Sequence, residues 1–120
     1  MNANINTYRE NAIATQSSGR LVVLLYDGAV KFLRQALKEL EAGHQAAKGE
    51  YINKAVAIIN ELDACLDVEA GGDVAANLRS LYHFMIRHLG EANIHRDPRR
   101  IQNVIECLQS LNEGWKSVTR

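Results

Sequence analysis

The sequence has one proline, two cysteines and no excess of charge of either sign, and each shortage excludes a class of protein. One proline and eight glycines in 120 residues are too few for a collagen-like or proline-rich disordered chain. Fourteen basic and fourteen acidic residues leave a formal net charge of zero, so no overall field attracts nucleic acid or an anionic membrane. We therefore expect no nucleic-acid partner.

The two cysteines and the short apolar runs bear on location. Cys65 and Cys107 form no Cys-x-x-Cys or Cys/His spacing, which favours free thiols in a reducing compartment. The longest aliphatic or aromatic run, Leu21 to Tyr26, has six residues, and the first eleven residues lack a basic start followed by an apolar stretch. We expect a cytoplasmic protein with no cleaved signal and no membrane insertion.

Hydrophobic residues make up 47% of the chain and charged residues 23%, which is typical of a folded globular domain. A chain of 120 residues is one ordinary domain and buries roughly two thirds of its unfolded surface, so it needs neither metal nor disulfide to fold. We expect a single domain over residues 17–120, preceded by a loosely docked N-terminal arm over residues 1–16. Three apolar residues in the arm are candidate anchors: Ile5, Tyr8 and Ile13.

Apolar residues recur at helical spacing in four segments, so we expect helices over about 18–41, 48–67, 73–93 and 98–118. Ser17 is a candidate N-cap, Gly43 suits the left-handed residue that ends a helix, and Asp97-Pro98 is a strong helix start. Gly71-Gly72 is expected to end the second connection. Rods of similar length with short connections predict an all-α fold, an antiparallel up-down-up-down four-helix bundle with a mobile N-terminal arm.

Three apolar residues exceed what one core face can bury. Six apolar residues in a row cannot all face one core, and Val23 and Leu24 fall on the side of the first helix that carries Asp27. Phe84 is displaced in the same way from the core face of the third helix. A binding partner, or the arm, could cover these side chains; scattered exposed apolar residues are also normal in folded proteins.

Other positions at the edges of the apolar stripes are weaker candidates for the same surface: Tyr26, Ile58, Tyr82 and Ile86. Tyr26 and Ile86 fit ordinary boundary core equally well, and Tyr82 is on the inward stripe of the third helix. Gly28 stands inside the first helix, where glycine costs about 1 kcal/mol relative to alanine. Its missing side chain permits close approach of a partner or of a neighbouring helix.

No catalytic constellation can be assembled from the sequence, so we expect neither enzyme activity nor a cofactor. A metal site would have to combine His83, His88, Glu91 and His95, and solvated histidines are the simpler interpretation because His83 and His88 point to different faces. The pair Asp63 and Asp67 is better explained as a solvated acidic edge than as an acid and base pair.

The order of motifs resembles one known family over nearly the whole chain. Leu25-Tyr26-Asp27-Gly28-Ala29-Val30, preceded by Tyr8 and Asn11, is similar to the start of the flagellar export chaperones of the FliS family. The later segments agree in order: Lys54 to Leu62, Leu66-Asp67, Gly71-Gly72-Asp73 to Leu78, Leu81-Tyr82, Met85, Leu89, Ala92-Asn93, Asp97-Pro98 and Trp115.

The resemblance implies a non-enzymatic chaperone that binds the disordered C-terminal segment of flagellin. It implies that binding prevents premature polymerisation and helps deliver flagellin to a gate component of the flagellar type III secretion apparatus. It also implies that the N-terminal arm covers part of the apolar groove and gives way to flagellin. A client-free structural bundle whose surplus apolar surface is a homodimer seam stays an alternative, and we expect a monomer or weak homodimer.

Overall fold

The computed structural model describes residues 18–118, and this part of the chain is made of four helices, α2 to α5. Their bounds are Ser18–Glu41 for α2, Gln45–Ala64 for α3, Val68–His95 for α4 and Pro98–Val118 for α5. The expected all-α four-helix bundle is confirmed. The candidate N-cap Ser17 and the arm lie outside the described residues.

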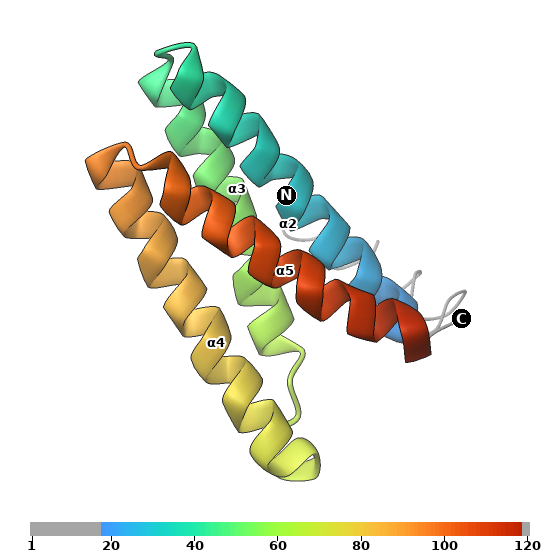
Figure 1. Cartoon of the computed structure of the whole chain (residues 1–120). Coiled ribbons are helices and arrows are strands. Elements are labelled where there is room, and N and C mark those ends of the chain that lie inside the picture. Colours follow the sequence, from blue (N-terminus) through green and yellow to red (C-terminus); the bar gives the residue numbers. More distant parts are fainter. Residues whose placement is uncertain (1–17, 119–120) are drawn as a thin grey trace, which may run out of the picture.

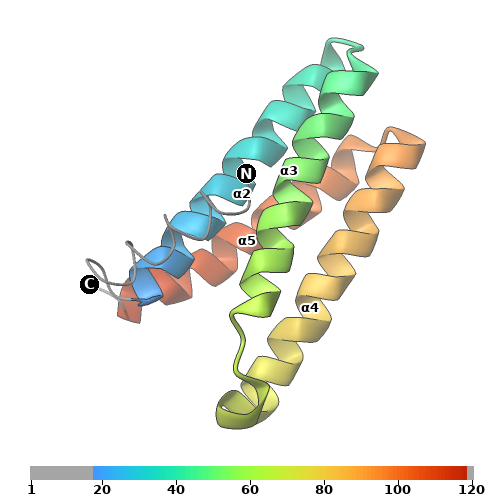
Figure 2. The ribbon, with the colours of Figure 1, turned by 180° about the vertical axis from the view of Figure 1, so that it is seen from behind.

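Successive helices run in opposite directions, and each packs on its neighbours in the order α2, α3, α4, α5 and back to α2. Figures 1 and 2 show α2 and α3 side by side along much of their length, while α5 crosses obliquely from the C-terminal end of α4 to the N-terminal end of α2. The backbones of α2 and α4 are not adjacent, and these two helices lie diagonally across the bundle.

The core is built from the inward stripe of each helix. Small residues on α2, α3 and α4 are fully buried and let neighbouring backbones approach, while long aliphatic side chains fill the space between the helices. Its fully buried members include Ala29, Leu33, Ala36, Ala55, Ile59, Met85, Leu89, Ala92, Ile101 and Leu108. Each buried Leu, Ile or Met contributes roughly 1.5–3 kcal/mol relative to exposure, which stabilises the antiparallel arrangement.

The connection between α3 and α4 differs from the expectation. The glycine pair was expected to end this connection, but the helical turn begins earlier, because the Asp67 side chain accepts a 3.0 Å hydrogen bond from the amide of Ala70. Gly72 then leaves the helical conformation at φ 55° and ψ −132°, which kinks α4 four residues after its start. Gly43, in contrast, has the expected left-handed φ of 79°.

A buried lysine fastens the other end of the α3 and α4 pair. Lys48 is 3% exposed, and its Nζ donates a 3.0 Å hydrogen bond to the carbonyl oxygen of Asn93 in the last turn of α4. A cation at this position complements the negative end of the helix dipole. Burial lowers the pKa of Lys48, and the charge of Arg96 lowers it further.

The described helices bear on two further points. None of them is long and apolar enough to cross a bilayer. Within residues 18–118 no three His, Cys, Asp or Glu side chains come together as ligands for a metal ion.

Candidate functional site

Leu24 and Phe84 are the two exposed side chains among the predicted surplus apolar residues. Leu24 is 42% exposed and Phe84 46% exposed, although each stands beside residues that enter the core. Val23 is half-buried. The six-residue run from Leu21 to Tyr26 explains the exposure on α2, since a helix turns successive residues by about 100° and cannot aim all of them inward.

Phe84 is held in place on the outside of α4. Its ring stacks on the ring of His88, one turn later, with centroids 5.0 Å apart and planes inclined by 23°. The Nε2 atom of His88 is buried and has no hydrogen-bond partner among the described residues. Phe84 therefore presents an aromatic surface, backed on one side by the His88 ring, that a partner could cover.

The exposed side chains of Leu24 and Phe84 belong to α2 and α4, whose backbones lie diagonally across the bundle and which meet through the buried side chains of Tyr26 and Tyr82. They cannot form a single compact patch, because α3 on one side and α5 on the other separate α2 from α4. A partner that covered both residues would have to run across one of these helices. Such a partner would be an extended segment rather than a compact domain.

Tyr26 and Tyr82 lie in the core and not at the surface. Tyr26 is fully buried and Tyr82 is 1% exposed, and their phenol oxygens are 2.5 Å apart. The pKa of both phenols is raised, first because burial disfavours the phenolate. The expectation that Tyr26 and Tyr82 contribute to the edge of a binding surface is therefore wrong. Both side chains are enclosed by the helices and leave no area for a partner to touch.

Gly28, Ile58 and Ile86 are half-buried at the margins of the core. A Cβ atom at Gly28 would lie 3.3 Å from Cδ1 of Ile58, which is a tight contact between α2 and α3. The close approach at Gly28 is thus made within the bundle. Ile58 and Ile86 both pack against the buried cluster, and their roles in binding stay predictions, as does that of Val23.

Several exposed apolar residues were missed from the sequence. Val74 is 70% exposed and Val68 36%, both at the start of α4 around the Gly72 kink. Ile94, near the end of the same helix, is 74% exposed. The turn formed before Gly72 accounts for the exposure of Val68, since this turn projects away from the other helices (Figure 1). The arm anchors Ile5, Tyr8 and Ile13 lie outside the described residues.

The candidate carboxylates and histidines make local polar contacts. Asp63 accepts a 3.1 Å hydrogen bond from Nε of Arg79 and lies 3.3 Å from Nε2 of His83, which links the end of α3 to α4. His95 lies 3.1 Å from Oε2 of Glu91. These contacts account for Asp63, His83 and His95 as parts of the helix connections.

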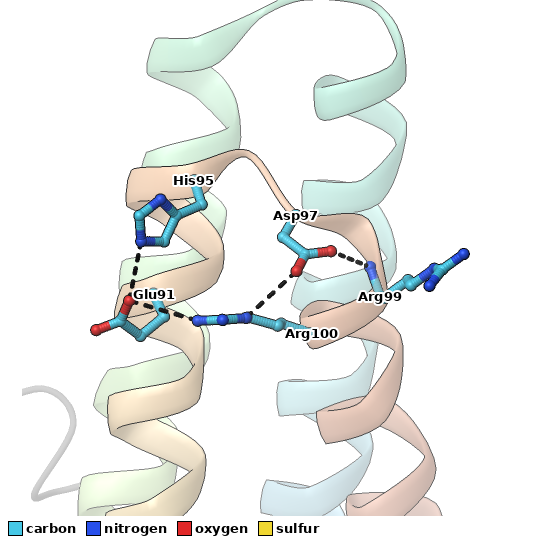
Figure 3. Close-up of polar contacts among 5 residues, drawn as sticks. All are labelled: Glu91, His95, Asp97, Arg99 and Arg100. Carbon is cyan, nitrogen blue, oxygen red and sulfur yellow. Dashed lines mark hydrogen bonds and ion pairs between the residues drawn. The ribbon is translucent and has the colours of Figure 1, made fainter.

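Figure 3 shows the corner between α4 and α5, where Arg100 joins two carboxylates. Its guanidinium lies 3.4 Å from Glu91 of α4 and 3.3 Å from Asp97, and Asp97 accepts a 3.0 Å hydrogen bond from the amide of Arg99. Asp97 thus has the capping role that the Asp97-Pro98 step predicts. Exposed ion pairs of this kind are worth about 1 kcal/mol or less, so the corner helps to orient α4 and α5 at a modest gain in stability.

Comparison with known proteins identifies the family to which this sequence is similar. The sequence model of the family described as "Flagellar protein FliS" matches residues 1–120. The chain belongs to the FliS family. The resemblance found in the motifs is therefore confirmed over the full length.

Curated relatives of this FliS-family chain carry the same description. The flagellar secretion chaperone FliS of Salmonella typhimurium is 42% identical over 111 residues, which cover 92% of this chain and 82% of the relative. That of Vibrio cholerae is 33% identical over 98% of this chain and 90% of its own length. The flagellar secretion chaperone FliSB of Pseudomonas aeruginosa is 36% identical over 93% of this chain and 92% of its own length.

Proposed function

We propose that this chain is a cytosolic export chaperone that binds the disordered C-terminal segment of flagellin. Binding prevents flagellin from polymerising prematurely and aids its delivery to a gate component of the flagellar type III secretion apparatus. Membership of the FliS family, whose relatives are named flagellar secretion chaperones, supports the flagellar role. The activity is binding alone, with no catalytic step and no cofactor.

The observation that carries the proposal is the exposure of Leu24 and Phe84 on two helices that lie diagonally across the bundle. Complete burial of a Leu or Phe side chain is worth about 1.5–3 kcal/mol, so covering what these residues expose contributes part of that at each. A disordered segment can follow the surface from one helix to the other and cover both residues. Ordering such a segment costs several kcal/mol, and a long contact over several helices offsets that cost.

Calorimetry with the purified chain and a peptide of the flagellin C-terminal segment tests the proposal. We expect one peptide per chain and a negative heat-capacity change, because apolar surface is removed from water. A titration without heat at every temperature, even at high micromolar concentration, would remove the proposed client.

The competing function is a structural homo-oligomer in which Leu24 and Phe84 form a seam between copies. Sedimentation over a concentration series separates the two functions. A chaperone stays mainly monomeric until the peptide is added, whereas a structural oligomer assembles by itself and leaves no apolar surface for the peptide.

A further inference from the structure

A groove of about 670 Å³ lies between α2 and α5, and most of the residues that line it are charged. The two helices meet near the C-terminal end of α5 and diverge toward the other end of the bundle (Figures 1 and 2). Residues of α2 from Asp27 to Lys38 form one wall, and residues of α5 from Gln109 to Lys116 form the other. The groove is distinct from Phe84, which is on α4.

The groove has more positive than negative charge. Four of its lining side chains are cationic and two are acidic, an excess of two positive charges in a chain whose formal net charge is zero. Three of the cations, Lys31, Arg34 and Lys38, follow one another on α2 at spacings of three and four residues. Residues at these spacings share one face of a helix, so the three side chains form a row along the wall.

The acidic residues in the groove lining do not form ion pairs with the three cations of this row. Asp27 is occupied by α5, since its Oδ1 accepts a 2.8 Å hydrogen bond from Nδ2 of Asn112 and lies 3.7 Å from Nζ of Lys116. Asn112 is only 4% exposed, so this arrangement is fixed by packing. None of the three cations in the row has an ion pair with a residue between 18 and 118.

An exposed apolar residue continues the row. Leu24 precedes Lys31 by seven residues, as Lys31 precedes Lys38, and two helical turns bring each of them back to nearly the same face. An exposed apolar anchor followed by cations at regular helical spacing matches a helical peptide with an apolar residue at one end and carboxylates along the same side. Uncharged Gln35 and Gln109 in the lining add hydrogen-bonding groups for such a peptide.

We infer that the groove between α2 and α5 docks an acidic amphipathic helical segment of a partner protein. This inference goes beyond the flagellin proposal and stands whether or not flagellin is the client. A peptide fits better than a nucleic acid because Asp27 and Glu113 in the lining repel a continuous row of phosphates, and the neutral chain supplies no long-range field to offset this. Separate carboxylates can avoid the two acids and still reach the row.

The test uses the full chain and two synthetic helical peptides that differ only in charge. One peptide has Glu at positions that match the α2 row and Leu two turns beyond, and the other has Gln in place of each Glu. We expect the acidic peptide to shift the backbone amide NMR signals of Lys31, Lys38 and Asn112 and to bind about tenfold more tightly than the Gln peptide. Equal affinity of the two peptides, or shifts confined to other helices, would overturn the inference.

Charge reversal gives a second, independent readout. Lys31→Glu with Lys38→Glu should weaken the acidic peptide by about tenfold or more, and a peptide with Lys in place of Glu should bind this variant instead. The matched control is Arg87→Glu with Arg99→Glu, which makes the same charge change on α4 and at the start of α5 and should leave affinity within about twofold. Equal weakening by both pairs would show a general charge effect and refute the groove.

Two measurements keep the result interpretable. If charge reversal unfolds the chain, judged by circular dichroism, Lys31→Gln with Lys38→Gln replaces it and should still weaken the acidic peptide severalfold. A short DNA duplex is titrated in parallel. Tighter binding of the duplex with the same amide shifts would assign the groove to polyanions and overturn the assignment to a protein segment.

Discussion

The phenol oxygens of Tyr26 and Tyr82 meet 2.5 Å apart and connect α2 to α4, two helices that do not otherwise pack together. Tyr26 also forms a side-chain hydrogen bond with Trp115 of α5, in which the indole N–H is the donor. Three helices therefore converge on one phenol oxygen in the core.

The first prediction concerns the unequal roles of these two tyrosines. Tyr26→Phe leaves the hydroxyl of Tyr82 and the indole of Trp115 without their partner, so we expect a loss of about 1–3 kcal/mol in the free energy of unfolding. Tyr82→Phe leaves the bond between Tyr26 and Trp115 intact and should cost less, about 0.5–1.5 kcal/mol. Urea unfolding of both variants measures the difference. Equal costs would show that the Trp115 contact contributes nothing.

Alkaline pH should destabilise the fold through the same pair. Burial raises the pKa of Tyr26 and of Tyr82 above the ordinary value of 10.0, so their contribution is complete below that pH and falls as the unfolded chain begins to release protons above it. The lowered pKa of Lys48 acts in the opposite direction and is common to all variants. Between about pH 8 and 11, the free energy of unfolding should fall less steeply with pH for the double variant Tyr26→Phe/Tyr82→Phe than for the wild type. An equal dependence of the free energy of unfolding on pH in both chains would show that the two tyrosines do not cause it.

Gly28 and Gly90 provide a matched pair for the tight contact between α2 and α3. Nothing lies within 4 Å of a Cβ built on Gly90, so Gly90→Ala should stabilise the fold by about 1 kcal/mol through helix propensity alone. Gly28→Ala gains the same propensity but presses on Ile58 at 3.3 Å. We expect a smaller gain from Gly28→Ala in the wild-type chain and a larger gain in a chain that already has Ile58→Val, which alone costs about 0.5–1.5 kcal/mol. Thermal unfolding compares the wild type, the three single variants and the Gly28→Ala/Ile58→Val double variant, and equal gains at both glycines would show that Ile58 exerts no constraint.

Two neighbouring residues of α4 should respond in opposite ways to the same substitution. Phe84 is 46% exposed and Met85 is fully buried. Phe84→Asp should change the free energy of unfolding by about 1 kcal/mol or less, whereas Met85→Asp should cost more than about 3 kcal/mol because it buries a charge. Circular dichroism and urea unfolding check both variants. A large loss for Phe84→Asp would mean that Phe84 belongs to the core.

The sequence was sufficient where a helix is governed by its own residues. The bounds of α2 and α5 follow from the apolar spacing, Gly43 and Asp97-Pro98, and the helical stripe assigned Tyr82 inward even though it was also named as a surface candidate. The start of α4 was predicted too late because Asp67 caps a turn before the glycine pair.

Residues that depend on another helix could not be found in this way. The burial of Lys48 requires the carbonyl of Asn93 on α4, and that of Asn112 accompanies a bond to Asp27 on α2, 85 residues earlier. Periodicity within one helix contains no information about such partners. The separation of Leu24 from Phe84 has the same origin, since it follows from the order of helices around the bundle.

The central claim is that the surface containing Leu24 and Phe84 binds the flagellin C-terminal segment, and calorimetry of Phe84→Asp beside Ile94→Asp tests it most directly. Ile94 is the control because it is on the same helix, is 74% exposed and is not assigned to the binding surface. The account predicts that Phe84→Asp weakens the segment by about tenfold or more while Ile94→Asp stays within about twofold of the wild type. Wild-type affinity in the Phe84→Asp chain, with its fold intact, would contradict the account.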